Sequence, residues 1–271
     1  SRGLGDVYKR QVMAVINYFE GNPLFNAGIG ATCTAEGTFE LDASIMEGKD
    51  LSAGAVAGLK HVKHPINAAY AVKTKSPHVM LSGAGAEEFA KEQGLEMVED
   101  NMYFATPKTM EWIEKLKQES KKNGTVGCVV LDKQGNLTAG TSTGGMFKKR
   151  WGRIGDSPVI GAGTYADNNS CAVSCTGHGE YFIRHAVAFD VCARYKYLKE
   201  SVEKAADYII HTELNTNAGN GGLIAVDKLG NIAMPYNSGG MFRGFLYKEK
   251  GSPEIKKGCG IGKKIVVVGE K

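Results

Sequence analysis

The sequence predicts an α+β fold in which stacked β-sheets are covered by helices. Predicted strands occur in a block at 125–175, two helices follow at 178–213, and further strands follow the helices. At 271 residues the chain is long enough for a sizeable core. Its 36 glycines are spread through apolar segments, which indicates tight turns and close backbone packing rather than disorder.

The elements of the first half are short. An amphipathic segment begins at Val12 and stops at Gly21. Residues 1–11 show neither the helical nor the strand period, and we interpret them as a leader that is foreign to the fold. The remaining predictions are strands at 38–48, 51–59 and 78–83 and helices at 65–76, 84–95 and 106–124, the last fading into a lysine-rich linker.

The second half contains a repeated hairpin. Residues 124–147 match residues 219–242 at a constant offset of 95, and in both copies an apolar strand turns at a D-K-x-G-N segment, where Gly and Asn accept positive φ. The copies differ where the first strand begins, because Thr125 corresponds to Asn220. The complete prediction is strands at 125–131, 136–143, 158–165, 170–175, 222–227, 231–236 and 240–247, with helices at 178–197 and 201–213.

The composition argues against several classes of function. The formal net charge of +4 is small, and its densest cluster, residues 147–153, is too short for a nucleic-acid footprint, so no nucleic-acid partner is expected. No run reaches the length of a membrane span, so no membrane partner is expected. The six cysteines form no C-x-x-C pair, which favours buried free thiols and a reducing, cytoplasmic compartment. A periplasmic location stays open, because a missing start would hide a signal.

Thr125 stands between the polar linker and an apolar strand, and two interpretations compete. Its β-branched side chain suits a routine strand opener. Alternatively, cutting the Gly124–Thr125 bond would make this threonine an N-terminus. Its α-amino group, with a pKa of about 7.7–8.0, would then lie within reach of its own hydroxyl as a base. A preceding glycine tolerates the strained backbone that attack on its carbonyl requires.

The surrounding motifs favour the second interpretation. They are NPLFNAGIGA (22–31), ELDASIMEG (40–48), AGAVAGLKHVKHPI (53–66), HVMLSGAGAEEFA (78–90), GTVG (124–127), TSTGGM (141–146), GRIGDSPVIGAGTYAD (152–167) and TGHGE (176–180). In order and spacing they resemble the isoaspartyl peptidase/L-asparaginase family, the plant-type asparaginases of the N-terminal-nucleophile (Ntn) hydrolase superfamily. The resemblance runs from about Val12 to Phe245 and implies a four-layer αββα sandwich that matures by autocatalytic cleavage.

The resemblance also implies the catalytic residues. Thr125 is the nucleophile, and the autocleavage site is the bond between Gly124 and Thr125. Thr143 lies beside the nucleophile and orients or polarises its hydroxyl. Thr176 and Gly177 form the oxyanion hole from one hydroxyl and one backbone N–H, at the start of the helix expected at 178–197.

The substrate-binding residues that the resemblance implies are Arg153, Asp156 and Gly179. A guanidinium holds the substrate's α-carboxylate in a two-pronged way, and a carboxylate holds its α-ammonium. His178 is left out of the catalytic set, because an α-amino base makes a histidine unnecessary.

Each assignment has a plain structural alternative. Arg153 suits a solvated cation, and Asp156 suits the cap of a turn. Thr176 suits an ordinary helix N-cap with Glu180 supporting the helix start. Thr143 suits a strand position that favours a branched side chain.

The resemblance implies that no cofactor is required, although a loop of some relatives holds a structural sodium. The partners it implies are small-molecule substrates, L-asparagine and β-aspartyl dipeptides, and a second copy of the chain in a homodimer of αβ heterodimers. In this sequence the sodium would be held by the backbone carbonyls of Phe19, Glu20, Asn22, Phe25, Ala27 and Ile29.

The expected organisation follows from the cleavage site. Residues 12–124 form part of an α-subunit with a linker at about 105–124, and residues 125–271 form the β-subunit. The family's first strand, with its H-G-G-A-G run, and the helix after it are missing, so we expect a truncated chain. The alternatives are a glycosylasparaginase-type amidase, which places His-Asp before the threonine where this chain has Asn123-Gly124, and a catalytically inactive fragment.

Overall fold

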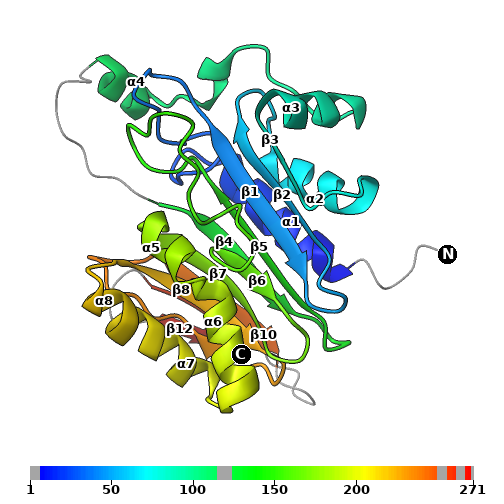
Figure 1. The fold of residues 1–271 in the computed structure, drawn as a ribbon, viewed down its shortest axis with the longest axis vertical. Coiled ribbons are helices and arrows are strands. Elements are labelled where there is room, and N and C mark those ends of the chain that lie inside the picture. The colour runs from blue at the N-terminus through cyan, green and yellow to red at the C-terminus, as the bar shows by residue number, and fades with distance from the viewer. Residues whose placement is uncertain (1–6, 115–123, 249–254, 261–265, 270–271) are drawn as a thin grey trace.

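The computed structural model describes residues 7–114, 124–248, 255–260 and 266–269 (Figure 1). Within these residues the chain has a mixed α/β architecture with a five-stranded, a four-stranded and a three-stranded sheet. Helices from the first half lie beside the five-stranded sheet, and helices from the second half lie beside the four-stranded sheet (Figure 1).

The five-stranded sheet joins the two halves of the chain. Its order is β3 (Met80–Ser82), β2 (Ala53–Leu59), β1 (Leu41–Glu47), β5 (Leu137–Thr143) and β4 (Val126–Leu131). The central strand β1 pairs antiparallel with both β2 and β5. Its register places Asp42 opposite Thr143, so residues from the two sides of the linker meet in one sheet.

Helices α1 (Val7–Glu20) and α2 (Pro65–Lys75) cover this sheet, and α3 (Gly83–Glu92) packs on β2. Small residues allow the close approach. A Cβ on Gly140 of β5 would lie only 2.6 Å from Val12 Cγ1 and 2.8 Å from Ile16 Cδ1 of α1. All of β1 is buried, so its alternating sequence confirms a strand but does not mark a solvent face.

The four-stranded sheet comes entirely from the second half of the chain. Its order is β6 (Thr164–Ala166), β7 (Cys171–Gly177), β8 (Gly221–Asp227) and β9 (Ile232–Ala233). Strands β4 and β5 contact β7, so the two sheets pack against each other. On the other side, α6 (Val187–Ala193) contacts β7 and α7 (Val202–Tyr208) contacts β8. Buried apolar residues lie between the sheets, among them Met46, Leu137, Ala139, Ala166, Ala172 and Val226.

The two helices expected at 178–197 and 201–213 are each divided. The first consists of α5 (Gly179–Arg184), α6 and a π-helical turn at Arg194–Leu198. Ala186, between α5 and α6, has φ 45°, a left-handed conformation that cannot continue a right-handed helix. The second consists of α7, a π-helical turn at Ile209–Glu213 and α8 (Leu214–Thr216).

Other boundaries also differ from expectation. Helix α1 begins at Val7, so the interpretation of 1–11 as irregular is wrong from that residue on. Residues 1–6 lie outside the described residues. The strand expected at 158–165 is wrong for 158–163, which turn back on themselves before β6. Of the strand expected at 231–236, only β9 forms.

Further elements lie before the expected linker and at the C-terminal end of the described residues. A 3₁₀ turn at Asn101–Phe104 precedes α4 (Pro107–Glu114), which confirms the start of the helix expected at 106–124. The linker residues 115–123 lie outside the described residues. The last expected strand begins later, as β10 (Arg243–Lys248). It pairs with two strands that no pattern predicted, β11 (Ile255–Gly260) and β12 (Val266–Gly269).

Both predicted hairpins are confirmed, and their turns are identical in detail. Asp132 accepts hydrogen bonds from the backbone N–H of Asn136 and from its side-chain amide, at 2.7 and 3.0 Å. Asp227 makes the same two bonds with Asn231, at 2.9 and 2.8 Å. The repeat therefore builds β4–β5 in one sheet and β8–β9 in the other.

The remaining composition-based expectations concern membranes and thiols. No helix in the described ranges is long and apolar enough to cross a bilayer. All six cysteines are free thiols, and four of them are buried as expected, whereas Cys128 is half-buried and Cys259 is exposed.

Candidate active site

Thr125 lies opposite Thr143, and the hairpin turn fixes this arrangement. Val126 pairs with Ser142 in the β4–β5 ladder, which places the preceding Thr125 at the level of the following Thr143. The Thr125 hydroxyl donates a hydrogen bond to Thr143 Oγ1 at 3.2 Å. The structure therefore brings the expected nucleophile and its expected neighbour together.

The carbonyl of Gly124 is held by two donors. Thr143 Oγ1 donates to it at 3.0 Å, and Asn26 Nδ2 donates to it at 2.7 Å. Thr143 also accepts the backbone N–H of Gly145 at 3.0 Å. A hydroxyl has one proton and two lone pairs, so the three bonds of Thr143 use its full capacity. The protons are thereby ordered from Thr125 to Thr143 to the Gly124 carbonyl.

Asn26 was missed by the residue-by-residue reasoning. Its Nδ2 donates to the carbonyls of Gly124 and Gly145 at 2.7 and 2.8 Å, and its Oδ1 accepts the Thr32 N–H at 2.8 Å. The signal lay inside the motif NPLFNAGIGA, whose glycines hold the loop in place. Gly28 has φ 52°, and a Cβ there would lie 2.2 Å from the Glu20 carbonyl oxygen.

Arg153 lies beside the same site but pairs with a side chain. Its Nε and Nη2 donate to the two carboxylate oxygens of Glu180, at 2.9 and 3.0 Å. The interpretation of Arg153 as a solvated cation is wrong, because only 19% of its side chain is exposed. The guanidinium lowers the pKa of Glu180 chiefly through this hydrogen bond. In the sequence, Glu180 enters only the alternative interpretation, as support for the helix start.

Asp156 is a buried carboxylic acid next to Arg153. Burial raises its pKa to about 7, although the Arg153 charge opposes the rise. Its Oδ2 has no hydrogen-bond partner among the described residues. Gly179 covers both groups, because a Cβ there would lie 2.8 Å from Arg153 Nη2 and 2.8 Å from Asp156 Oδ1. The three expected substrate-binding residues therefore form one cluster.

Backbone and hydroxyl bonds hold the segment after Asp156 in place. The Ser44 hydroxyl donates to the Ser157 carbonyl at 2.6 Å, and Ser44 Oγ lies 2.8 Å from Thr164 Oγ1. A Cβ on Gly163 would lie 2.4 Å from the Asp156 carbonyl oxygen. These contacts join β1, β6 and the loop after Asp156 in a fully buried position.

Gly177 ends β7 in a conformation that requires glycine. Its φ is 154°, and a Cβ would lie 2.5 Å from the Asn220 carbonyl oxygen. Thr176 shares a face of β7 with Ser174, which lies against Gly127 of β4, so we place Thr176 on the side that faces β4. The reading of Thr176 as the helix N-cap is wrong, because His178 is the N-cap of α5.

His178 is partly exposed beside the start of α5. About 40% of its side chain is exposed, and its Nε2 is 3.5 Å from Glu180. Its ring packs edge-on against Tyr181.

One small cavity collects the two groups of residues. Thr125 and Thr143 line it together with Arg153, Asp156 and Gly177, and its free volume is about 10 Å³. That volume holds about one water molecule. Gly124 itself lines the cavity, so its displacement would enlarge the space beside the threonine. The arrangement places a hydroxyl, a cation and a carboxyl around one point.

Comparisons with known proteins agree with the geometry. A family model described as "Asparaginase" matches residues 5–255. The isoaspartyl peptidase of Salmonella typhimurium is 48% identical over 90% of this chain and 82% of its own length. The isoaspartyl peptidase of Escherichia coli is 44% identical over 89% of this chain and 82% of its own length. The isoaspartyl peptidase/L-asparaginase of Mus musculus is 43% identical over 85% of this chain and 72% of its own length.

Proposed function

The chain belongs to the asparaginase family, and from this premise we propose that it is a self-processing amidohydrolase of β-aspartyl dipeptides and L-asparagine. The observation that carries the proposal is the proton chain at the linker junction. The Thr125 hydroxyl donates to Thr143 at 3.2 Å, and Thr143 donates to the Gly124 carbonyl at 3.0 Å. A hydroxyl, its proton acceptor and a polarised carbonyl thus stand at one peptide bond.

Self-cleavage follows from these contacts. Thr125 Oγ1 attacks the Gly124 carbonyl carbon, and its proton passes through Thr143 to the departing Thr125 nitrogen. Negative charge develops on the Gly124 oxygen, where Asn26 Nδ2 at 2.7 Å and Thr143 Oγ1 stabilise it. The C–N bond breaks and leaves an ester, which water hydrolyses to a Gly124 carboxylate and a free Thr125.

Turnover reuses the same hydroxyl with a new base. The free α-amino group of Thr125 accepts the hydroxyl proton, and Oγ1 attacks the side-chain carbonyl of the substrate. The amide nitrogen leaves as ammonia or as the amino group of the second residue, and water hydrolyses the β-aspartyl ester to aspartate. Gly177, which lines the cavity, donates its N–H to the oxyanion together with the Thr176 hydroxyl.

Substrate recognition is assigned to the charged side of the cavity. Arg153 binds the α-carboxylate, and Asp156 binds the α-ammonium. The half-exposed Glu180, 47% of whose side chain is accessible, keeps the Arg153 fork oriented until the substrate arrives. Gly179 supplies the space, because any side chain there would press on both charged groups.

The proposal extends to the architecture. We assign the chain to the four-layer αββα sandwich of the Ntn hydrolases, with residues 12–124 as the α-subunit part and 125–271 as the β-subunit. The packing of helices on both sheets supports this assignment. A homodimer of αβ heterodimers in the cytoplasm is proposed with it.

The loop after α1 is compatible with a bound structural sodium ion. The carbonyls of Phe19, Glu20 and Asn22 accept the backbone N–H groups of Asn22, Ile29 and Phe25 at 3.1, 2.8 and 3.3 Å, respectively. Each carbonyl oxygen keeps a second lone pair, so the loop could present these oxygens to a hard cation. The chemistry requires no cofactor.

Denaturing mass spectrometry tests the function. The protein should yield a fragment beginning at Thr125, Thr125→Ala should abolish it, and the mature protein should hydrolyse β-aspartyl dipeptides. Cleavage that persists in Thr125→Ala would contradict the nucleophile assignment. Hydrolysis of N-glycosylated asparagine alone would favour a glycosylasparaginase, and the absence of both reactions would favour an inactive fragment.

A further inference from the structure

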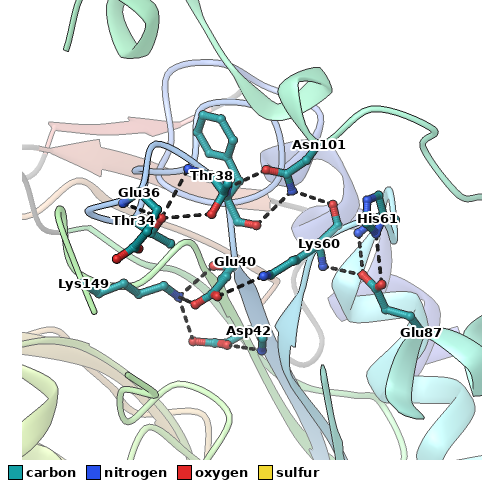
Figure 2. A network of polar contacts seen from close by, with 12 residues as sticks. Thr34, Glu36, Thr38, Glu40, Asp42, Lys60, His61, Glu87, Asn101 and Lys149 are labelled. Atoms are coloured by element: carbon teal, nitrogen blue, oxygen red, sulfur yellow. Dashed lines mark hydrogen bonds and ion pairs between the residues drawn. The ribbon is translucent and has the colours of Figure 1, made fainter. Parts of the chain in front are cut away.

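Lys149 is a buried ammonium that the reaction described above does not use. Only 1% of its side chain is exposed. Its Nζ donates to the Glu40 carbonyl at 2.8 Å and lies 3.9 Å from the Glu40 carboxylate and 4.0 Å from the Asp42 carboxylate (Figure 2). Asp42 is equally buried, and its Oδ1 accepts the Gly58 N–H at 2.8 Å. Buried charges are costly to desolvate, so this pair calls for an explanation.

The Lys149 side chain lies beside the turn that organises the scissile bond. A Cβ on Gly145 would lie 3.2 Å from both Nζ and Cδ of Lys149. The Gly145 N–H donates to Thr143 Oγ1 at 3.0 Å, and the Gly145 carbonyl accepts Asn26 Nδ2 at 2.8 Å. Thr143 and Asn26 are the two groups that hold the Gly124 carbonyl. One glycine therefore connects the buried cation to both donors.

The partner of the cation stands at the same level of the sheet. Asp42 lies directly opposite Thr143 in the β1–β5 ladder. Lys149 is thus anchored by the strand next to the one that carries Thr143, and it supports the turn that follows Thr143.

We propose that Lys149, held by Glu40 and Asp42, is a positioning residue that fixes Gly145 so that Thr143 and Asn26 meet the Gly124 carbonyl. This inference rests on the proposed self-cleavage. The competing explanation is an ion pair that stabilises the fold alone. The two differ in what they predict for a protein that folds normally without the pair.

The test compares two double variants. Lys149→Met/Asp42→Asn removes both charges, so neither is left alone in the core and the net charge near Arg153 and Asp156 stays the same. The Glu40 carboxylate keeps an ion-pair partner in this variant, because Lys60 Nζ is 3.6 Å away. The matched control is Lys73→Met/Glu47→Gln. It removes another buried ion pair, with side chains 6% and 4% exposed, at the far end of β1.

The readouts are the melting temperature, the rate at which the fragment beginning at Thr125 appears, and the kinetics of the mature enzyme. We expect the Lys149 double variant to cleave at least tenfold more slowly than the control at a comparable melting temperature. The mature variant should lose kcat on a β-aspartyl dipeptide and keep its KM within about twofold, because Arg153 and Asp156 are untouched. A purely structural role would not separate kcat from KM.

Two outcomes overturn the inference. Cleavage at the unmodified rate in a folded Lys149 double variant would leave Lys149 with a role in stability only. An equal loss of cleavage in the Lys73 control would show that any buried pair on β1 has this effect. If the unmodified protein fails to cleave at Gly124, the proposed function itself fails, and the two failures are thereby distinguished.

Discussion

Replacing Asp156 by asparagine should make the uncut protein more stable above neutral pH. Asp156 is buried, with 4% of its surface exposed, and burial raises its pKa from 3.8 to about 7. Between these values the folded protein binds a proton that the unfolded chain has lost. The free energy of unfolding therefore falls as the pH rises through this window. Asparagine has a similar shape and does not titrate, so the variant lacks this loss.

The size of the effect follows from the difference between the two pKa values. Each pKa unit corresponds to about 1.4 kcal/mol, so the rise to about 7 amounts to roughly 4 kcal/mol at full ionisation. We expect the variant and the parent to differ by a constant amount below about pH 4. The variant should then gain roughly 4 kcal/mol relative to the parent between pH 4 and pH 8, most of it before pH 7.

Urea unfolding from pH 4 to pH 8 measures this difference. Both proteins should carry Thr125→Ala, which keeps the chain uncut. Asp50→Asn is the matched control, because Asp50 is exposed and hydrogen bonds from Ser52 lower its pKa, so it titrates below the window. If the free energies of unfolding of Asp156→Asn and its parent differed by the same amount at every pH, the claim that Asp156 stays protonated up to about pH 7 would be refuted.

Three further predictions concern the mature enzyme. Arg153→Ala should raise KM for β-aspartyl dipeptides at least tenfold, because a charge-assisted bidentate contact to the substrate is lost. Self-cleavage, followed by mass spectrometry, should persist. An unchanged KM would show that Arg153 does not bind the substrate. Gly179→Ala should raise KM because its methyl group would lie 2.8 Å from the Arg153 guanidinium. Gly85→Ala on α3, where a Cβ meets nothing within 4 Å, should leave KM unchanged. Equal KM values for the two variants would contradict the steric argument. His178→Asn should leave the acidic limb of the pH–rate profile in place, since the proposed base is the α-amino group of Thr125. Loss of that limb would require a threonine–histidine pair instead.

The sequence by itself determined the features that depend on neighbouring residues. The D-K-x-G-N turns predicted both hairpins, because their conformation is set within five residues by glycine, asparagine and an aspartate that binds the backbone. The β4–β5 hairpin in turn fixed the level of Thr125 against Thr143. The motif order predicted the family and the cluster of Arg153 and Asp156. No periodicity predicted strand β11, whose sequence IKKGCG is rich in glycine and lysine, residues that are depleted in strands. The short valine-rich strand β12, VVVG, was not predicted either.

Only the tertiary structure decided which distant groups meet. Asn26 reaches the Gly124 carbonyl across 98 residues, and Arg153 turns to Glu180 across 27. Neither of these separations along the chain produces a periodic pattern in the sequence. The break at Ala186 is likewise invisible locally, since alanine is a strong helix former and only packing holds it at φ 45°. The raised pKa of Asp156 likewise depends on desolvation by burial. Burial of this kind is a property of the assembled fold, because it is contributed by every element that excludes water from the side chain.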